Sequence, residues 1–225
     1  TRTILFNSEH VNLVSLFTPE HGLDGNELAG KWVPSRVDSL TGLKAFSLYG
    51  KTRKPNPVML NGIDVLVFDI QDVGVRCYTY ISTMVLCMEA AADKGIEFIV
   101  LDRPNPVTGN CIEGPPIVSK WQSFVGQLPI PFRHGLTVGE IAKMAVGENW
   151  LKSNPKLKVI KMNGWNRDMS WADTGLNWVQ TSPNIPRAKS CYYYLLSCIP
   201  QYVKGVYAGT GGSHPFEHIS TSGVS

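Results

Sequence analysis

The sequence lacks the long apolar runs and the long charged runs that membrane spans and nucleic-acid-binding segments need. None of its hydrophobic stretches approaches the roughly 20 residues of a membrane-spanning helix. Its formal net charge is +3, and its Lys and Arg residues are scattered along the chain. This distribution favours neither nucleic acid nor a membrane surface as a partner. We therefore expect a neutral or small charged ligand.

The sequence also lacks the short motifs of metal and nucleotide sites. Its five cysteines form no C-x-x-C pair, so we expect buried or half-buried thiols. A metal site assembled from His21, Asp69, Asp72 and His134 is the weakest hypothesis, because no H-x-x-x-H or H-x-E spacing involves these residues. No G-x-G-x-x-G or G-x-x-x-x-G-K-[ST] loop follows a hydrophobic run. We expect neither a metal nor a nucleotide cofactor.

Three short hydrophobic runs each end in a cluster of polar residues. The runs and their clusters are residues 11–17 before 18–22, residues 65–68 before 69–74, and residues 98–101 before 102–106. Such continuous runs are typical of strands buried on both faces of a parallel sheet. Open α/β sheets bind ligands beyond the carboxyl ends of their strands. We therefore expect the three clusters to meet at one edge of the sheet and form a single site.

The rest of the pattern predicts an α/β fold with a mostly parallel sheet flanked by helices. Helices are predicted at residues 79–94 and 137–146, the second with Thr137 as N-cap and Glu140 at the capping-box position. The other predicted elements are strands at 45–48, 157–162 and 192–196, and a long loop at 23–41. Strand, helix and strand over residues 65–101 form a βαβ unit.

Glu20 and His21 place a carboxylic acid and an imidazole at the end of the first run. Pro19 restricts the backbone before them and Gly22 frees it after them. A carboxyl group in a partly buried crevice can hold a proton near neutral pH, which suits Glu20 as a general acid. The alternative is a solvated loop glutamate.

The second cluster carries two carboxylates and an amide. In an extended segment Asp69 and Gln71 point one way and Asp72 the other. We choose Asp72, close to Gly74, as the acid that faces the cleft. The alternative is that Asp69 caps the following turn while Arg76 neutralises both acids in an ion-pair network.

Five further side chains are candidates for binding a substrate. Tyr78 and Tyr80 offer rings on which a sugar can stack, or they belong to the core. Two prolines stiffen the third cluster, where Arg103 offers a planar fork for a carboxylate and Asn105 a donor and an acceptor. The alternative there is a rigid structural loop with an Asp-Arg pair. His134 precedes a predicted helix and either lines the same cleft or is incidental.

Eight motifs follow one another through residues 11–186. They are FTPEHG at 17–22, SLYG at 47–50, FDIQDVGVR at 68–76, YTY at 78–80, LDRPNP at 101–106, EGP at 113–115, HGLTVGE at 134–140 and SPN at 182–184. In type and order they resemble the bacterial exo-β-N-acetylmuramidase family, which was once catalogued only as a domain of unknown function.

The resemblance implies a fold and an activity. It implies a Rossmann-like catalytic domain over residues 1–190, the truncated and irregular start of a smaller ancillary domain at 191–225, and a site in the cleft between them. The implied activity is release of N-acetylmuramic acid from the non-reducing ends of peptidoglycan fragments, without a metal or nucleotide. It places the protein outside the cytoplasm, although the sequence starts at Thr1 without a signal peptide.

The resemblance also implies roles for individual residues. Glu20 resembles the catalytic acid, with Asp72 as a second carboxylate of the usual glycosidase plan. The residues expected to bind or shape the muramyl sugar are His21, Gln71, Arg76, Tyr78, Tyr80, Arg103, Asn105, His134 and Asn184. A fixed arginine suits the lactyl carboxylate of that sugar.

Two departures from the family pattern lead to a second hypothesis. The family has a strand upstream of the first motif that this chain lacks, and a Glu-Gly-Arg stretch where the chain has Lys204-Gly205-Val206. Codons for Glu-Gly-Arg give Lys-Gly-Val when they are read one base late, so we hypothesise that this segment is frame-shifted. Translation of the source DNA in its other two frames tests this hypothesis. The alternative function is then a non-catalytic, inactive fragment that binds cell-wall sugars.

Overall fold

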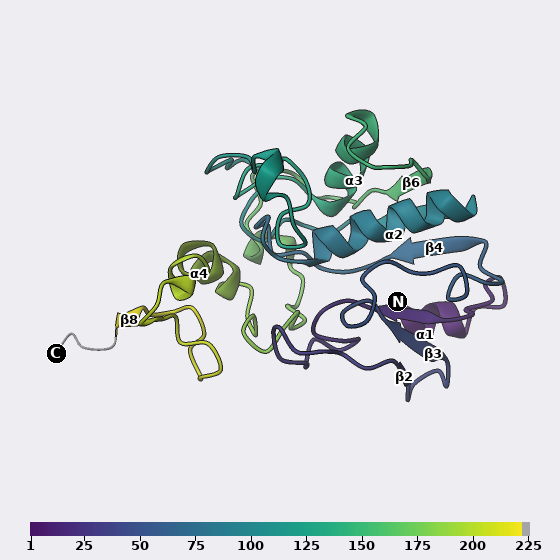
Figure 1. Ribbon diagram of the computed structural model, residues 1–225, viewed down its shortest axis with the longest axis horizontal. Helices are drawn as coiled ribbons and strands as arrows, with labels where there is room; N and C mark the ends of the chain where they lie inside the picture. Colours follow the sequence, from purple (N-terminus) through teal and green to yellow (C-terminus); the bar gives the residue numbers. More distant parts are fainter. Residues whose placement is uncertain (222–225) are drawn as a thin grey trace.

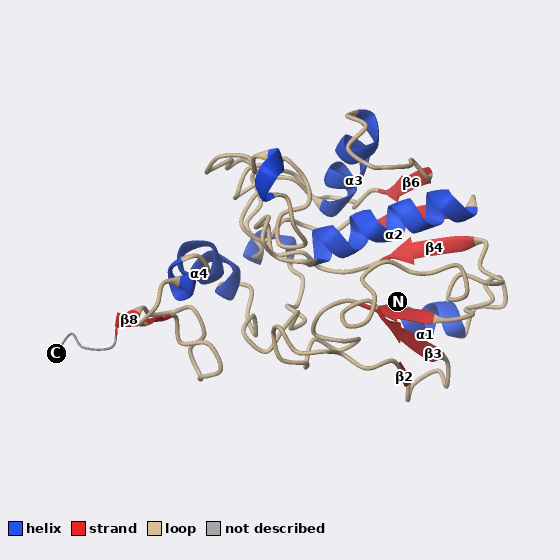
Figure 2. Ribbon diagram, viewed as in Figure 1, coloured by secondary structure: helices blue, strands red, loops and turns tan. Residues whose placement is uncertain are grey.

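Parallel strands form the centre of the chain, as predicted, but they divide into two sheets. The computed structural model describes residues 1–221. One sheet has the order β4-β5-β6 and is parallel throughout. Its strands are β4 (Val65–Phe68), β5 (Glu97–Leu101) and β6 (Lys156–Ile160). The predicted α/β fold with a mostly parallel sheet is confirmed. Figure 2 shows the arrowhead of β4 pointing toward a group of loops.

The other sheet has the order β1-β3-β2. Strand β1 (Leu16–Thr18) lies parallel to β3 (Lys44–Ser47), and β2 (Arg36–Val37) pairs with β3 in the antiparallel sense. The strand predicted at 11–17 is therefore shorter than expected. Within residues 1–221, β1 has a ladder partner on one edge only, so nothing holds the residues before Leu16 in strand geometry. The predicted loop at 23–41 is interrupted only by β2.

Two helices cover one face of the β4-β5-β6 sheet (Figure 1). Helix α2 (Tyr80–Lys94) ends at Gly95, whose φ of 74° is the left-handed conformation that favours glycine at this position. Helix α3 (Val138–Gly147) begins with the capping box predicted for Thr137 and Glu140. Both helices lie close to their predicted bounds because these signals are local in the sequence.

The main core lies between these helices and the sheet. Met84 and Met88 of α2, Phe98 of β5 and Ile141 of α3 are fully buried there. On β4 alternate residues are exposed, with Val65 at 39% and Val67 at 38%. The expectation that these strands are buried on both faces is therefore wrong for β4, because α2 and α3 pack on one face only.

The C-terminal segment contains a helix where we predicted a strand at 192–196. Helix α4 (Ser190–Ser197) turns Cys191, Tyr194 and Cys198 toward a second apolar cluster. These positions recur at the three- and four-residue spacing of one helix face, a signal that a strand assignment overlooks. Figure 1 shows α4 and the segment after it beside the sheets, away from β2 and β3.

The remaining elements are short. They are α1 (Arg2–Phe6), η1 (Ser119–Trp121), η2 (Ala172–Thr174), η3 (Pro200–Tyr202), β7 (Val206–Tyr207) and β8 (Ser220–Thr221). The second cluster joins residues of the C-terminal segment to Val73, Val75 and Ile185. In the part of the chain that the structure describes, no helix has both the length and the apolar character needed to cross a membrane.

Candidate active site

The carboxyl group of Glu20, in the first polar cluster, is held inside the protein by residues from two other segments. This side chain is buried, with 7% of its surface exposed. Its Oε2 atom accepts a hydrogen bond of 2.7 Å from the hydroxyl of Thr79, the residue before α2, and its Oε1 atom accepts one of 2.8 Å from the Gly30 N–H. The solvated loop glutamate that we considered as the alternative is therefore wrong.

The backbone that carries Glu20 is held in an unusual conformation. His21 has a φ of 72° and Gly22 a φ of 76°. For a residue with a side chain, this left-handed geometry costs about 1–2 kcal/mol. The Nδ1 atom of His21 lies 2.8 Å from the Glu27 carbonyl oxygen, a contact that holds the strained turn. Strain of this kind is concentrated at functional sites.

His21 packs against the two tyrosines of the YTY motif. Its ring centroid lies 6.1 Å from that of Tyr78 and 6.2 Å from that of Tyr80. Burial lowers the pKa of His21, and this effect outweighs the Glu27 carbonyl and the charge of Glu20, which both raise it. His21 is therefore a neutral, buried part of the wall behind Glu20.

Tyr78 and Tyr80 are buried and do not form the sugar-stacking platform considered above. The Tyr78 hydroxyl donates to Oγ1 of Thr181 at 2.9 Å, and the Tyr80 hydroxyl donates to the Thr181 carbonyl at 2.6 Å. Their rings are 4.7 Å apart, edge to face. The core alternative fits these contacts, because both rings and both hydroxyls already have partners inside the protein.

Asp72 and His134 face each other in the interior. Nδ1 of His134 accepts the Leu136 N–H at 3.1 Å, so a neutral ring carries its proton on Nε2. That Nε2 atom lies 3.4 Å from Oδ2 of Asp72 and makes no hydrogen bond among the described residues. The Gly74 N–H donates to the same Oδ2 atom at 2.7 Å. Oδ1 of Asp72 is buried and has no hydrogen-bond partner within residues 1–221. One carboxylate oxygen thus remains able to accept a hydrogen bond.

The charges of Glu20 and Asp72 both raise the pKa of Tyr80. Burial is the main cause of the raised pKa of Tyr80, and the negative charges of Glu20 and Asp72 raise it further. Two carboxylates from different clusters therefore lie close enough to influence one hydroxyl. The convergence of all three clusters in a single site stays a prediction.

Asp69 and Arg103 form an ion pair that joins the second and third clusters. Nε of Arg103 donates to Oδ1 of Asp69 at 2.7 Å. Asp69 is thus the structural acid of the cluster, but the alternative in which Arg76 neutralises both acids is wrong. Arg76 instead donates to the carbonyl oxygens of Pro115 at 2.8 Å and Ile130 at 2.7 Å.

Three other candidates are also occupied by contacts within the protein. Gln71 donates to the Pro104 carbonyl at 2.8 Å, although its Oε1 atom is buried without a partner among the described residues. Asn105 donates to the Leu136 carbonyl at 3.0 Å and accepts the Val107 N–H at 3.0 Å. Asn184 accepts the Gly211 N–H at 3.0 Å. Gln71 and Asn105 thus hold the loops after β4 and β5, and Asn184 holds the loop at Gly211.

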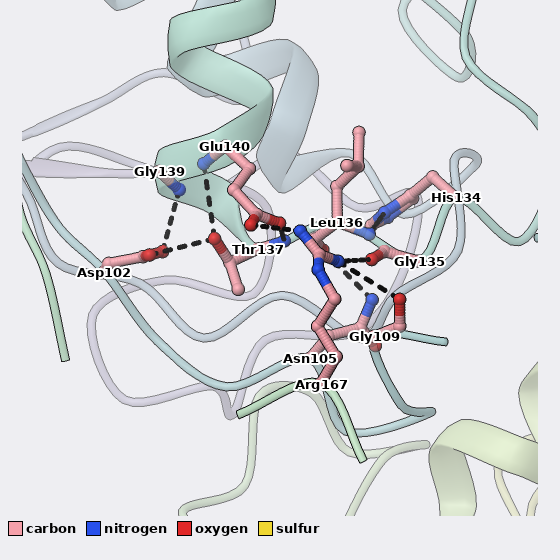
Figure 3. Close-up of polar contacts among 10 residues, drawn as sticks. All are labelled: Asp102, Asn105, Gly109, His134, Gly135, Leu136, Thr137, Gly139, Glu140 and Arg167. Atoms are coloured by element: carbon pink, nitrogen blue, oxygen red, sulfur yellow. Dashed lines mark hydrogen bonds and ion pairs between the residues drawn. The ribbon is translucent and has the colours of Figure 1, made fainter. Parts of the chain in front are cut away.

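Figure 3 shows how the third cluster is fixed to the start of α3. Asp102 accepts hydrogen bonds from the Thr137 hydroxyl at 2.9 Å and the Gly139 N–H at 2.8 Å, and both donors lie at the helix N-terminus. Arg167 donates to the Gly109 carbonyl at 3.1 Å and pairs with Glu140. This network holds the loop that contains His134 and does not itself present a group to a ligand.

The sequence analysis assigned no role to Tyr49 or Thr79, although they lie in the SLYG and YTY motifs. The Tyr49 side chain approaches Glu20. Burial raises the pKa of Tyr49 to about 12, aided by the charge of Glu20 and by hydrogen bonding to it. The carboxyl group therefore has a hydroxyl neighbour from the loop after β3 as well as one from the residue before α2.

No metal site is evident in residues 1–221, where no group of three or more His, Cys, Asp or Glu side chains is placed to hold an ion. A hollow of about 310 Å³ lies in the C-terminal segment. It is lined by Tyr207, Thr210, His214, His218 and small residues between them. None of the candidate site residues lines it.

Comparison with known proteins identifies the family of this chain. Residues 1–189 match the sequence profile of the N-terminal domain of exo-β-N-acetylmuramidase NamZ. The chain belongs to this family. The NamZ-family chain is 47% identical over 216 residues to the peptidoglycan β-N-acetylmuramidase NamZ of Bacillus subtilis (strain 168), covering 96% of this chain and 51% of that protein.

Solved structures from Bacteroides fragilis NCTC 9343 share the fold of this NamZ-family chain. One DUF1343 family protein has a TM-score of 0.92 and 48% identity, covering 100% of this chain and 57% of that one. A second has a TM-score of 0.75 and 34% identity, covering 93% and 54% respectively. The chain thus spans about half the length of the relatives that it matches.

Proposed function

We propose that this NamZ-family chain is a glycoside hydrolase that releases N-acetylmuramic acid from the non-reducing ends of peptidoglycan fragments. The observation that carries the proposal is the buried carboxyl group of Glu20, held by Thr79 and Gly30 at the end of β1. A glycosidase needs a carboxyl group that delivers a proton to the leaving oxygen. The proposal also draws on the activity named for the Bacillus subtilis relative.

Glu20 acts as the general acid in this proposal. A hydroxyl group can both donate and accept a hydrogen bond. Thr79 therefore keeps its contact with Glu20 whether the carboxyl group is ionised or protonated, because only its hydroxyl proton has to rotate. The acid can lose and regain its proton without moving its backbone.

Asp72 is the second carboxylate. Its Oδ2 atom is held by Gly74 and faces the His134 ring, while Oδ1 has no partner among the described residues. In the two-carboxylate plan such a group acts as a base on water or as the nucleophile.

The substrate determines where the protein works. Peptidoglycan lies outside the cytoplasmic membrane, so we propose an extracytoplasmic location. No step in the proposed reaction uses a metal or a nucleotide. Activity that disappears on addition of a chelator would contradict this part of the proposal.

The test is hydrolysis of a chromogenic glycoside of N-acetylmuramic acid by this chain and by its Glu20→Gln variant. Loss of a general acid lowers the rate by about 10²–10⁴-fold. Glu148, exposed at the end of α3, provides a matched control, and we expect Glu148→Gln to keep the wild-type rate.

Two outcomes would change the proposal. If Glu20→Gln melts like the wild type and keeps its rate, Glu20 is not the acid. If the wild-type chain binds the sugar but releases no chromophore, the alternative of a non-catalytic sugar-binding protein replaces the hydrolase.

A further inference from the structure

Arg53 differs from the other arginines of residues 1–221. Six of the other seven pair with carboxylates, and Arg76 donates to two backbone carbonyls. The six paired residues are Arg2, Arg36, Arg103, Arg133, Arg167 and Arg187. Among the described residues no oxygen is hydrogen-bonded to the guanidinium of Arg53, which is exposed.

Two aromatic rings flank the guanidinium of Arg53. Its Cζ atom lies 4.1 Å from the ring centroid of Phe124 and 5.4 Å from that of Tyr49. The two rings are themselves 6.0 Å apart. Stacking of this kind restrains the plane of a guanidinium and leaves its N–H edge free for a planar, bidentate acceptor.

Tyr49 connects Arg53 to the catalytic acid. The chain leaves β3 beside β1, because the Leu48 N–H donates to the Thr18 carbonyl at 2.8 Å. The ring of Tyr49 then lies under Arg53, and Glu20 is close enough to Tyr49 to help raise the pKa of its hydroxyl. An unpaired cation and a candidate proton donor therefore flank the same tyrosine.

We infer that Arg53, held by Tyr49 and Phe124, binds the carboxylate of the substrate beside the acid Glu20. The inference rests on the proposed function and names the residue that recognises the lactyl carboxylate of its substrate. It replaces Arg103 and Arg76 in that role. The fork of Arg103 is occupied by Asp69, and Arg76 is held by the carbonyls of Pro115 and Ile130.

The experiment compares two chromogenic substrates that differ only in the lactyl ether: the glycosides of N-acetylmuramic acid and of N-acetylglucosamine. In Arg53→Met, kcat/KM for the muramic acid glycoside should fall about 10- to 100-fold, which corresponds to about 1.4–2.8 kcal/mol. Most of the change should appear in KM. The rate on the N-acetylglucosamine glycoside should change by less than about twofold, because no charge-assisted bond is lost there.

Two further variants sharpen the comparison. Arg53→Lys keeps the charge but not the planar fork, so its loss should lie between those of the wild type and Arg53→Met. Lys143→Met removes one positive charge from an exposed position on α3 and should affect neither substrate. Affinity for free N-acetylmuramic acid, measured by calorimetry, should follow the same order among the variants.

The outcomes separate this inference from the proposed function. Equal losses on both glycosides, or no loss on either, overturn the role of Arg53 while the hydrolase proposal stands. A wild-type chain that neither hydrolyses the muramic acid glycoside nor binds the free sugar overturns the proposed function. Loss confined to the muramic acid substrate supports the inference.

Discussion

The hydrogen bond between Thr79 and Glu20 offers the most direct test of the site. The Thr79 hydroxyl makes no capping bond to α2 and donates instead to Glu20 at 2.7 Å between two buried side chains. Thr79→Val removes the donor and keeps the shape. A hydrogen bond to a charged group contributes about 1.5–3 kcal/mol to the free energy of unfolding. We expect Thr79→Val to lower the free energy of unfolding by that amount.

The size of the effect can be measured by urea unfolding and by thermal melting. For a chain of this length each kcal/mol shifts Tm by about 2–4 °C, so the expected decrease in Tm is about 3–12 °C. Thr79→Ser keeps the hydroxyl, so its Tm should decrease much less. Glu20→Gln should also be mild, because its amide can donate to Thr79 while its oxygen accepts from Gly30.

A double-mutant cycle isolates the pair from other effects. Glu20→Met removes both acceptor oxygens, and its combination with Thr79→Val should show a coupling energy of at least about 1 kcal/mol, since residues in direct contact couple by about 0.5–3 kcal/mol. Additive losses, or a Thr79→Val protein as stable as Thr79→Ser, would refute the contact. The reasoning about Glu20 would then lose its main support.

Three further predictions follow from single contacts. Burial lowers the pKa of His21 below its usual 6.5, so on acidification the unfolded chain is protonated at His21 before the folded one, and the free energy of unfolding falls as the pH drops below about 6.5. His21→Asn should weaken this pH dependence in urea unfolding, and an unchanged pH dependence contradicts the prediction. Gly74→Ala places a Cβ 2.4 Å from an amide oxygen at a φ of +81° and should lower the free energy of unfolding by at least about 2 kcal/mol. Gly62→Ala, where the Cβ meets nothing within 4 Å, should lower it less, and equal decreases contradict the close contact. The Sγ atoms of Cys77 and Cys198 lie 3.7 Å apart, so oxidised glutathione should convert the pair to a disulfide by two exchanges that release two reduced glutathiones, and a peptide map without the linked pair contradicts this.

Local signals in the sequence predicted most of the elements around the site. The capping box of Thr137 and Glu140 and the left-handed Gly95 act over a few residues, so α2 and α3 begin and end near their predicted positions. The Val65–Phe68 run became β4 unchanged. The helix at Ser190–Ser197 was missed because its consecutive tyrosines favour a strand, although its apolar positions recur at the three- and four-residue spacing of a helix face.

The partners of the charged side chains could not be predicted from local patterns. Arg103 was expected to bind a carboxylate of the substrate, and it binds that of Asp69, 34 residues earlier in the chain. Arg53 received no role, since nothing in its neighbouring sequence indicates that Phe124 will stack on it. Pairing of this kind depends on which loops the fold brings together.

The sequence by itself determined the parallel strands, their helices and the family, and it singled out Glu20 as the candidate acid. Each of these is encoded in residues that are close neighbours along the chain. Only the tertiary structure decided which hydroxyl holds that acid, which arginine keeps its N–H edge free and which tyrosines are buried. Those outcomes depend on burial and on competition for hydrogen bonds among residues far apart in the chain. Such competition is resolved only when the loops pack against one another.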